Sequence, residues 1–230
     1  MPYTCTMRFK VDIHFNVAEI QVNRVIRYFI FSDLLFWGGW GFVNPIFALF
    51  VAARIPGADA FVVGLAFALY WITKSIVQIP VALYLDRSDR DHLDLHVLIG
   101  GLMLAGFVAM SFPMAPNTGV LYLLMVLQGV AYGFYTPSWS AVFSRHLDKS
   151  HYAFDWSLDS TTIGIASGIA ALVGGTLASW LGFNLVFVLT GFFSFLSGLL
   201  LLSVPDLVMP KATINVPPII PDHTPGTPKV

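Results

Sequence analysis

Two long stretches of the 230-residue sequence contain no Asp, Glu, Lys or Arg. They are the 50 residues between Asp94 and Arg145 and the 46 residues between Asp159 and Asp206. A soluble domain would have to expose much of these stretches to water. The whole chain is 57% hydrophobic and 11% charged, whereas soluble domains contain about 25% charged residues. The sequence therefore predicts an all-α, polytopic membrane protein.

Each charge-free stretch is long enough for two helices and a turn, because one membrane span needs roughly 20 apolar residues. Pro113 and Gly119 mark the first turn, and Gly182 marks the second. These residues interrupt a helix where water can satisfy the backbone. Together with two apolar segments upstream, they predict six transmembrane helices, at 28–51, 60–85, 95–112, 119–143, 158–181 and 184–204.

Lys and Arg are distributed unevenly between the two sides of the expected helices. One side holds only Arg54, and Lys74 lies inside a span. The other ten are on the side of both chain ends: Arg8, Lys10, Arg24, Arg27, Arg87, Arg90, Arg145, Lys149, Lys211 and Lys229. Since cytoplasmic loops are rich in Lys and Arg, we expect a multi-pass protein of the cell (plasma or inner) membrane with cytoplasmic N- and C-termini.

This orientation divides the chain into three parts. Residues 1–27 are expected to form a cytoplasmic segment, and residues 28–205 the six-helix transmembrane bundle. Residues 206–230 belong to an end in which seven of the last 26 residues are proline. Such composition is typical of a disordered tail, which would lie in the cytoplasm.

A short motif occurs twice, 92 residues apart. Gly41-Phe-Val-Asn-Pro45 lies in the first expected span and Gly133-Phe-Tyr-Thr-Pro137 in the fourth. Each places a proline in mid-helix, where the helix can bend. A copy of three helices has an odd number of crossings, so the second copy would run in the opposite direction. The spacing predicts a 3+3 inverted repeat, an arrangement found in transporters.

Motifs at three places resemble the major facilitator superfamily (MFS). The loop after the second span matches the family signature G-x-L-x-D-R-x-G-R-[KR] at Asp86, Arg87 and Arg90. The fourth span contains the residues of the family's Q-G-x-x-x-G helix, beginning at Gln128. The fifth span is similar to the family's helix five, but Ala170-Ala171 replaces the Gly-Pro pair associated with antiporters. The resemblance covers about residues 25–205.

The resemblance implies half of an MFS fold, resembling the N-terminal half, in a transporter that normally has twelve helices. Such a transporter moves a small solute by alternating access between its two halves. Since one half cannot enclose a path, the expected partners are the lipid bilayer, a small-molecule solute, and a second copy in a homodimer or a homologous half. The alternative is a non-transporting membrane scaffold or one subunit of a heteromeric membrane complex.

Eleven residues on the first, second and fourth spans are predicted to line the solute cavity. They recur every three or four residues, so each stripe follows one helix face. Aromatic rings with polar tips suit a solute of mixed polarity. The predicted cavity residues are Asp33, Trp37, Trp40, Asn44, Tyr70, Lys74, Gln78, Gln128, Tyr132, Tyr135 and Trp139.

Lys74 is the most informative of these residues because it lies near the middle of its span. A charge there costs about 2.5–3.5 kcal/mol on insertion scales and usually faces a cavity and a partner. We expect Asp33 to be that partner, with solute or a proton competing for the pair.

Four charged residues at the cytoplasmic end are expected to form a gate, with Arg145 as the partner of Asp86. The gate residues are Asp86, Arg87, Arg90 and Arg145. In the fifth span, Gly164, Gly168 and Gly175 predict close helix packing.

Several function classes are excluded by the sequence. An enzyme is not expected, because the chain has no G-x-S-x-G or H-E-x-x-H motif. The single cysteine, Cys5, excludes a cysteine-cluster metal site, and we expect no cofactor. A net charge of −1 argues against nucleic acid as a partner.

Overall fold

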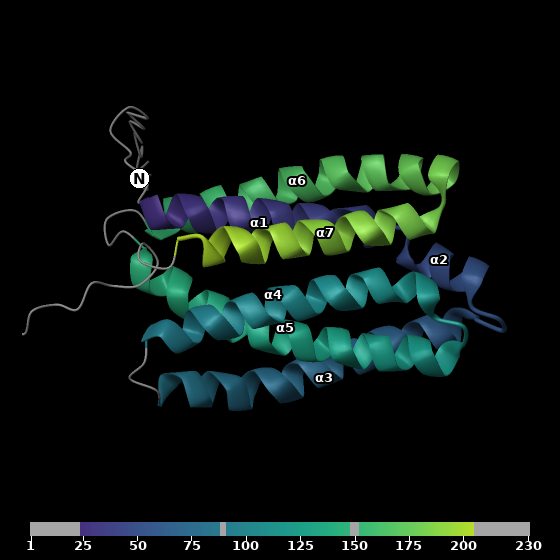
Figure 1. Ribbon diagram of the computed structural model, residues 1–230, viewed down its shortest axis with the longest axis horizontal. Helices are drawn as coiled ribbons and strands as arrows, with labels where there is room; N and C mark the ends of the chain where they lie inside the picture. The colour runs from purple at the N-terminus through teal and green to yellow at the C-terminus, as the bar shows by residue number, and fades with distance from the viewer. Residues whose placement is uncertain (1–23, 88–90, 148–151, 205–230) are drawn as a thin grey trace, which may run out of the picture.

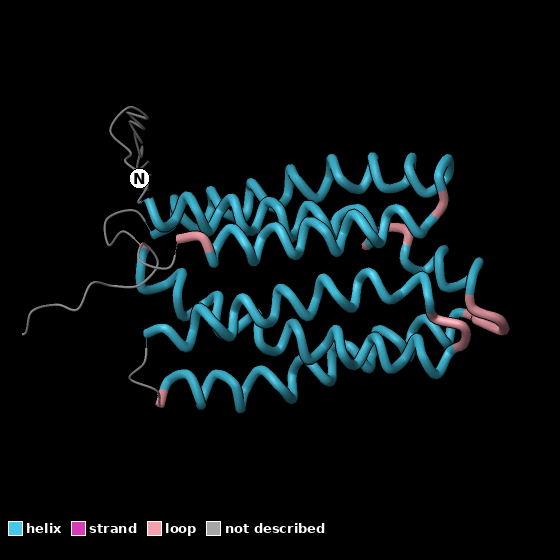
Figure 2. The backbone as a smooth tube through the Cα atoms, viewed as in Figure 1, coloured by secondary structure: helices cyan, strands magenta, loops and turns pink. Residues whose placement is uncertain are grey.

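The computed structural model describes residues 24–87, 91–147 and 152–204, and its regular secondary structure in these ranges is helical (Figure 2). Residues 1–23, the gate residue Arg90 and the expected tail 206–230 lie outside the described residues. The helices are α1 (Arg24–Val43), α2 (Phe47–Arg54), α3 (Ala60–Asp86), α4 (Asp91–Ser111), the 3-10 helix η2 (Phe112–Met114), α5 (Thr118–His146), α6 (Tyr152–Leu181) and α7 (Phe183–Leu202).

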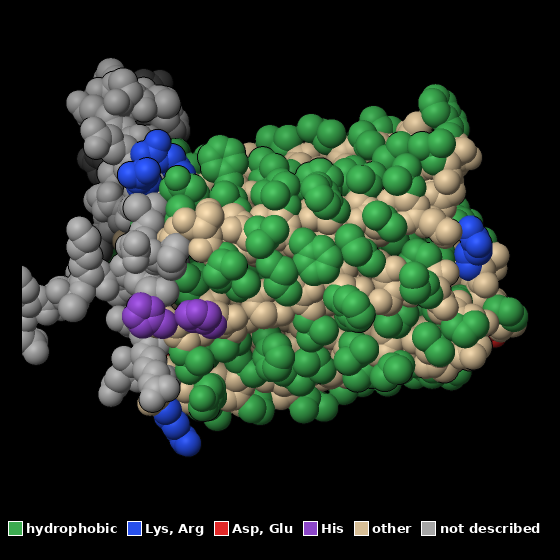
Figure 3. Space-filling view, viewed as in Figure 1, with side chains coloured by type: hydrophobic (Ala, Val, Ile, Leu, Met, Phe, Trp, Pro, Cys, Tyr) green, Lys and Arg blue, Asp and Glu red, His purple; other side chains and the backbone are tan. Residues whose placement is uncertain are grey.

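Five of these helices are long and apolar enough to cross a membrane, and α1 with α2 forms a sixth span if the pair is counted as one. The lateral face in Figure 3 is covered by hydrophobic side chains, with Lys, Arg and His near its two ends. Lipid can solvate such a face, while helices satisfy their own backbone groups. The predicted all-α polytopic membrane protein is confirmed.

The two copies of the proline motif have different structures. At the first copy the helix breaks over residues 44–46, and α1 and α2 are bent by 44°. Pro45 has no N–H to continue the helical hydrogen bonds. Pro137 of the second copy lies inside an uninterrupted α5. Helix α6 begins at Tyr152, six residues before the predicted start of its membrane span at residue 158.

The helices form two groups of three, which appear as two layers in Figure 1. One layer contains α1, α6 and α7, and the other contains α3, α4 and α5. The first span therefore packs against the fifth and sixth, while the fourth packs against the second and third. The first helix of each half of the sequence therefore packs with the last two helices of the other half, which is a reciprocal exchange of partners. The inverted repeat itself stays a prediction.

The two layers meet most extensively where α4 crosses α7. A Cβ atom added to Gly106 of α4 would lie 2.9 Å from the carbonyl oxygen of Gly191 on α7. A Cβ added to Gly191 would lie 2.6 Å from the carbonyl oxygen of Gly106. Both distances are below real van der Waals contact, so the crossing brings backbone against backbone and requires glycine on both helices.

Within the upper layer, small polar side chains join α1 to α7. The Thr190 hydroxyl donates a hydrogen bond of 2.8 Å to the carbonyl oxygen of Gly39, and the Ser197 hydroxyl donates one of 2.9 Å to that of Ser32. Hydrogen bonds of this kind link helices in lipid, where apolar contact alone gives little preference for a neighbouring helix over lipid.

The face of α6 that was predicted to pack is not the face that contacts α1. Cβ atoms at Gly164, Gly168 and Gly175 would meet open space, so the expected close packing at these three positions is wrong within the described chain. The neighbouring Gly174 makes the tight contact instead, against the backbone of Phe42 on α1. Helices α3 and α6 form opposite edges of the bundle (Figure 1), and only 6% and 11% of their most apolar segments are buried.

Candidate functional site

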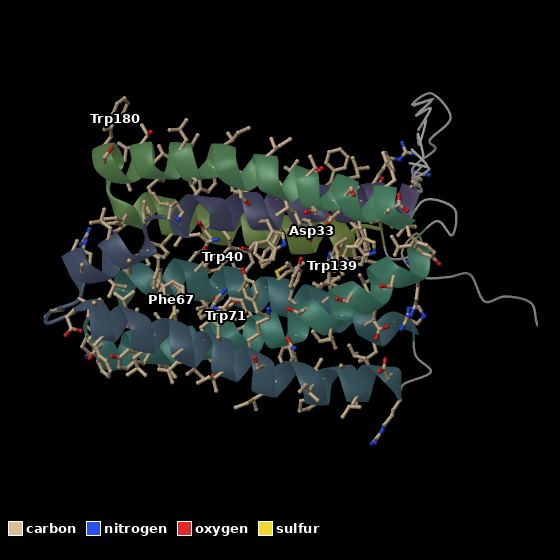
Figure 4. The ribbon with its side chains drawn as sticks, turned by 180° about the vertical axis from the view of Figure 1, so that it is seen from behind. Asp33, Trp40, Phe67, Trp71, Trp139 and Trp180 are labelled. Atoms are coloured by element: carbon tan, nitrogen blue, oxygen red, sulfur yellow. The ribbon has the colours of Figure 1, made fainter. Side chains whose placement is uncertain are left out.

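A cavity of about 310 Å³ lies between the two layers, with walls from the α1–α2 segment, α3 and α5 and from Phe112 of η2. Figure 4 labels three of its residues, Trp40, Phe67 and Trp71, in the space between the layers. Seven of the eleven predicted cavity residues line it: Trp37, Trp40, Asn44, Tyr70, Lys74, Gln128 and Tyr132.

The cavity has further apolar walls that the sequence analysis did not identify. These residues are Val43, Phe47, Phe67, Trp71, Phe112 and Met125. Phe67 and Trp71 precede Lys74 by seven and three residues, so they share its helix face. The same spacing rule could have found them, but the search followed polar side chains.

Lys74 lies among aromatic rings in the cavity wall. Its Nζ atom is 4.9 Å from the centroid of the Trp71 ring and 6.0 Å from that of Tyr132. These distances are typical of cation–π contacts, which are strongest where water is excluded. Among the described residues, Lys74 and Asp33 do not form the predicted ion pair, so this prediction was wrong.

Two buried polar groups of the cavity wall have no hydrogen-bond partner among the described residues. Gln128 is 3% exposed, and both its amide nitrogen and its amide oxygen are unpaired. Trp40 is 6% exposed, and its indole N–H is unpaired. Since the great majority of buried polar atoms in proteins are hydrogen-bonded, unpaired ones beside a cavity indicate room for a polar ligand or water.

Asp33 does not line the cavity but forms a buried acid pair with Asp159. Asp33 is completely buried, and its Oδ1 atom accepts a hydrogen bond of 2.8 Å from the Tyr135 hydroxyl. The Asp159 carboxyl, from α6, lies beside it. One oxygen of each carboxyl has no hydrogen-bond partner among the described residues. Tyr135 thus separates the acid pair from the cavity.

Asp159 was not predicted as a site residue, because α6 was expected to begin only at residue 158. In the longer helix, Asp159 lies nearly two turns inside and is 3% exposed. Asp155 is 2% exposed. Their four-residue spacing could have shown that both acids share one helix face.

An aromatic cluster closes the bundle on the N-terminal side of the cavity. We call it the aromatic plug, and it comprises Phe29, Trp139, Phe143 and Trp156. The Trp139 and Phe143 rings stack at a centroid distance of 4.5 Å, and Phe143 also lies 6.2 Å from Phe29 and 5.0 Å from Trp156. Figure 4 shows Trp139 beside Asp33 and nearer the N-terminal end than Trp40. Trp139 and Tyr135 were predicted to line the cavity, and they do not.

The remaining predicted residues lie along α3 and at the N-terminal end of the bundle. Gln78 is half-buried, one turn beyond Lys74, and does not line the cavity. Asp86 and Arg87 are exposed at the end of α3. The Arg145 guanidinium pairs with Asp94 of α4, at 2.5 Å between Nη2 and Oδ2. The prediction that Arg145 would pair with Asp86 was therefore wrong.

The sequence is similar to several transporters. An uncharacterized MFS-type transporter of Methanocaldococcus jannaschii is 22% identical over 174 residues, which cover 75% of this chain and 44% of that protein. The proton-coupled antiporter flippase LtaA of Staphylococcus saprophyticus is 25% identical over 84 residues, 36% of this chain and 21% of the flippase.

The fold is similar to that of the POT family transporter PepTSo. The TM-score is 0.62 at 16% sequence identity, and the match covers 81% of this chain and 38% of the transporter. The chain thus spans less than half the length of the relatives it matches. The model of the Major Facilitator Superfamily matches residues 29–221, and the chain belongs to this family as roughly one six-helix half.

Proposed function

We propose that this chain is one half of a transporter in the cell membrane, with both termini in the cytoplasm, and that it moves a small solute by alternating access. The observation that carries this proposal is the cavity. Three chain segments bring a cation, an unpaired buried amide and several aromatic rings to one space. Transport by a rocking of two six-helix bundles around a central site needs such a solute-binding space in the bundle wall.

The proposed solute contacts are the seven predicted residues that line the cavity. Asp33, Tyr135 and Trp139 then support the wall from behind, through the hydrogen bond from Tyr135 to Asp33. At the cytoplasmic end, we assign the gate to Asp86, Arg87, Arg90 and Arg145. The ion pair from Arg145 to Asp94 supports this role, because it ties the end of α5 to α4.

The other half of the transporter would be a second copy of this chain or a homologous six-helix bundle. Two observations support a docking role for the edge helices. The faces of α3 and α6 are the least buried in the bundle, and Gly164 and Gly168 leave open space on α6. Small residues allow close approach of helices in lipid. The exchange of partners between layers supports the proposed inverted repeat.

Alternating access predicts that one cavity position reacts with reagents from both sides of the membrane. The test uses Trp71→Cys in a Cys5→Ser background, reconstituted in vesicles and treated with a membrane-impermeant thiol reagent from either side. Complete labelling from each side is expected as the cavity opens in turn. Trp180→Cys, 81% exposed at the end of α6, is the matched control and should react from one side only. Labelling of Trp71→Cys from a single side would favour a scaffold.

The docking surface can be tested by cross-linking. Ser75→Cys on α3 and Gly168→Cys on α6 are both exposed positions. In a homodimer, oxidation should join copies through these positions and not through Phe107→Cys and Phe192→Cys, which are exposed on α4 and α7. Cross-linking only after addition of another membrane protein would identify a homologous half or a heteromer instead.

A further inference from the structure

The charge of the cavity is set by one residue. Among the described residues that line it, Lys74 is the only charged side chain, and no carboxyl group lines the wall. The Lys74 ammonium faces the rings of Trp71 and Tyr132 rather than an acid. A cation in a membrane-embedded site normally has a counter-charge. The cavity leaves that position open to a ligand.

The buried acids cannot supply this counter-charge in the described arrangement. Asp33 accepts its hydrogen bond from Tyr135, on the far side of an aromatic wall. In that wall the ring of Phe36 lies 4.7 Å from Tyr135 and 5.4 Å from Tyr132, centroid to centroid. The cavity wall of a second copy would bring another Lys74 and no carboxyl group from its own lining residues.

Unpaired hydrogen-bonding groups accompany the cation. The Gln128 amide offers donors and an acceptor, and the Trp40 indole offers a donor. A carboxylate or another oxyanion accepts from such donors and from an ammonium group at once, and charge-assisted hydrogen bonds are the stronger kind.

The size and walls of the cavity indicate the rest of the ligand. A volume of about 310 Å³ is at the lower end of the range for small-molecule sites, which is roughly 300–1,000 Å³. Indole and phenol rings from three helices surround this space. Rings prefer offset or edge-to-face contact with other planar groups. The walls therefore suit a planar, apolar body of about the size of one ring.

From these observations we infer that the cavity binds a small organic anion with a planar apolar body, with the anionic group at Lys74, Gln128 and Trp40 and the body among the rings. This inference rests on the proposed function, because it assigns the solute class of the same cavity.

The test compares three probes that share one body and differ in charge. They are 4-fluorophenylacetate, 4-fluorophenylacetamide and 2-(4-fluorophenyl)ethylammonium. The full-length chain is placed in phosphatidylcholine nanodiscs, so that no anionic lipid headgroup competes for Lys74. Binding is measured by the broadening of the fluorine NMR signal. We expect the anion to bind at least about tenfold more tightly than the neutral amide.

Three variants test the role of the charge. Lys74→Met keeps an apolar stem and should abolish the preference for the anion, whereas Lys74→Arg should retain it. Arg54→Met is the matched control, because it removes an exposed positive charge outside the cavity and should leave the preference unchanged. Circular dichroism before each titration shows that the variant is folded.

Each other outcome overturns the inference. Equal binding of the anion and the amide, tighter binding of the ammonium, a preference that survives Lys74→Met, or no binding of any probe would each do so. None of these results decides the proposed function, which depends on two-sided labelling of Trp71→Cys. Conversely, selective anion binding with one-sided labelling would describe a binding protein and not a transporter.

Discussion

The cavity and the aromatic plug occupy neighbouring regions between the same two layers, yet they are built differently. The plug fills its space with aromatic rings in stacked, tilted and edge-to-face contact, and Phe143 at its centre is completely buried. The cavity has a volume of about 310 Å³, with an unpaired amide at Gln128 and exposed rings at Phe67 and Trp71. The comparison shows that aromatic rings fill the bundle at one end, while a cation and unpaired polar groups line an open space at the other. Unpaired polar atoms alone do not distinguish the two regions, because the indole N–H of Trp139 in the plug also has no hydrogen-bond partner among the described residues.

The largest expected effect comes from removing a ring from the plug. Phe143→Ala should lower the free energy of unfolding by about 3 kcal/mol, because the surrounding rings lose their contacts and cannot refill the space. Phe67→Ala, in the cavity wall and 40% exposed, should change it by no more than about 0.5 kcal/mol. Unfolding in mixed micelles with increasing denaturant measures both. Similar losses in the two variants would show that the regions do not differ in packing.

A smaller effect is expected at the boundary between the regions. Tyr135→Phe removes the hydrogen bond that the Tyr135 hydroxyl donates to the buried Asp33 carboxyl. The expected loss is about 1–3 kcal/mol in the same unfolding measurement. Tyr132→Phe is the matched control one turn away, facing the cavity, and should stay within about 0.5 kcal/mol of the natural chain. An equal loss in the control would mean that Tyr135 acts through ring packing alone.

The smallest effect should have the opposite sign. Gln128→Leu replaces an unpaired buried amide with an apolar side chain of similar size, so stability should be unchanged or rise by up to about 1 kcal/mol. Binding of 4-fluorophenylacetate should weaken at the same time, because a donor is lost. A clear loss of stability would contradict the view that this amide is held for a ligand. Together with Tyr135→Phe, this variant distinguishes side chains whose loss lowers the free energy of unfolding from side chains whose loss weakens ligand binding.

Hydropathy was sufficient to predict the helices, because lipid imposes the same length and composition on every span. Hydropathy was less accurate in predicting where each helix begins and ends. Helix α6 begins six residues before the predicted span, so Asp159 was placed near the membrane surface and was missed as a site residue. Periodicity predicted that Trp37 and Trp40 share one face of α1 and that Gln128 lies on the corresponding stripe of α5, and all three line the cavity. Periodicity gives no information on how each helix is rotated about its axis relative to its neighbours.

Because the rotation of each helix about its axis could not be predicted, both predicted ion pairs were wrong. Asp33 and Lys74 lie on spans that are consecutive in the sequence, yet Asp33 is turned towards α5 and α6. Arg145 likewise reaches Asp94 rather than Asp86. A charged side chain can pair with any of several nearby groups, and tertiary packing decides which one it meets. Packing contacts such as those at the glycines of α6 cannot be predicted from the spacing of residues along a single helix.

The crossing of Gly106 and Gly191 lies at the joint between the layers whose separation forms the cavity. At this joint the carbonyl oxygen of each glycine lies close to the position that a Cβ atom on the other glycine would occupy. A methyl group at either position would act as a wedge. The width of the cavity is therefore expected to depend in part on two residues that do not line it.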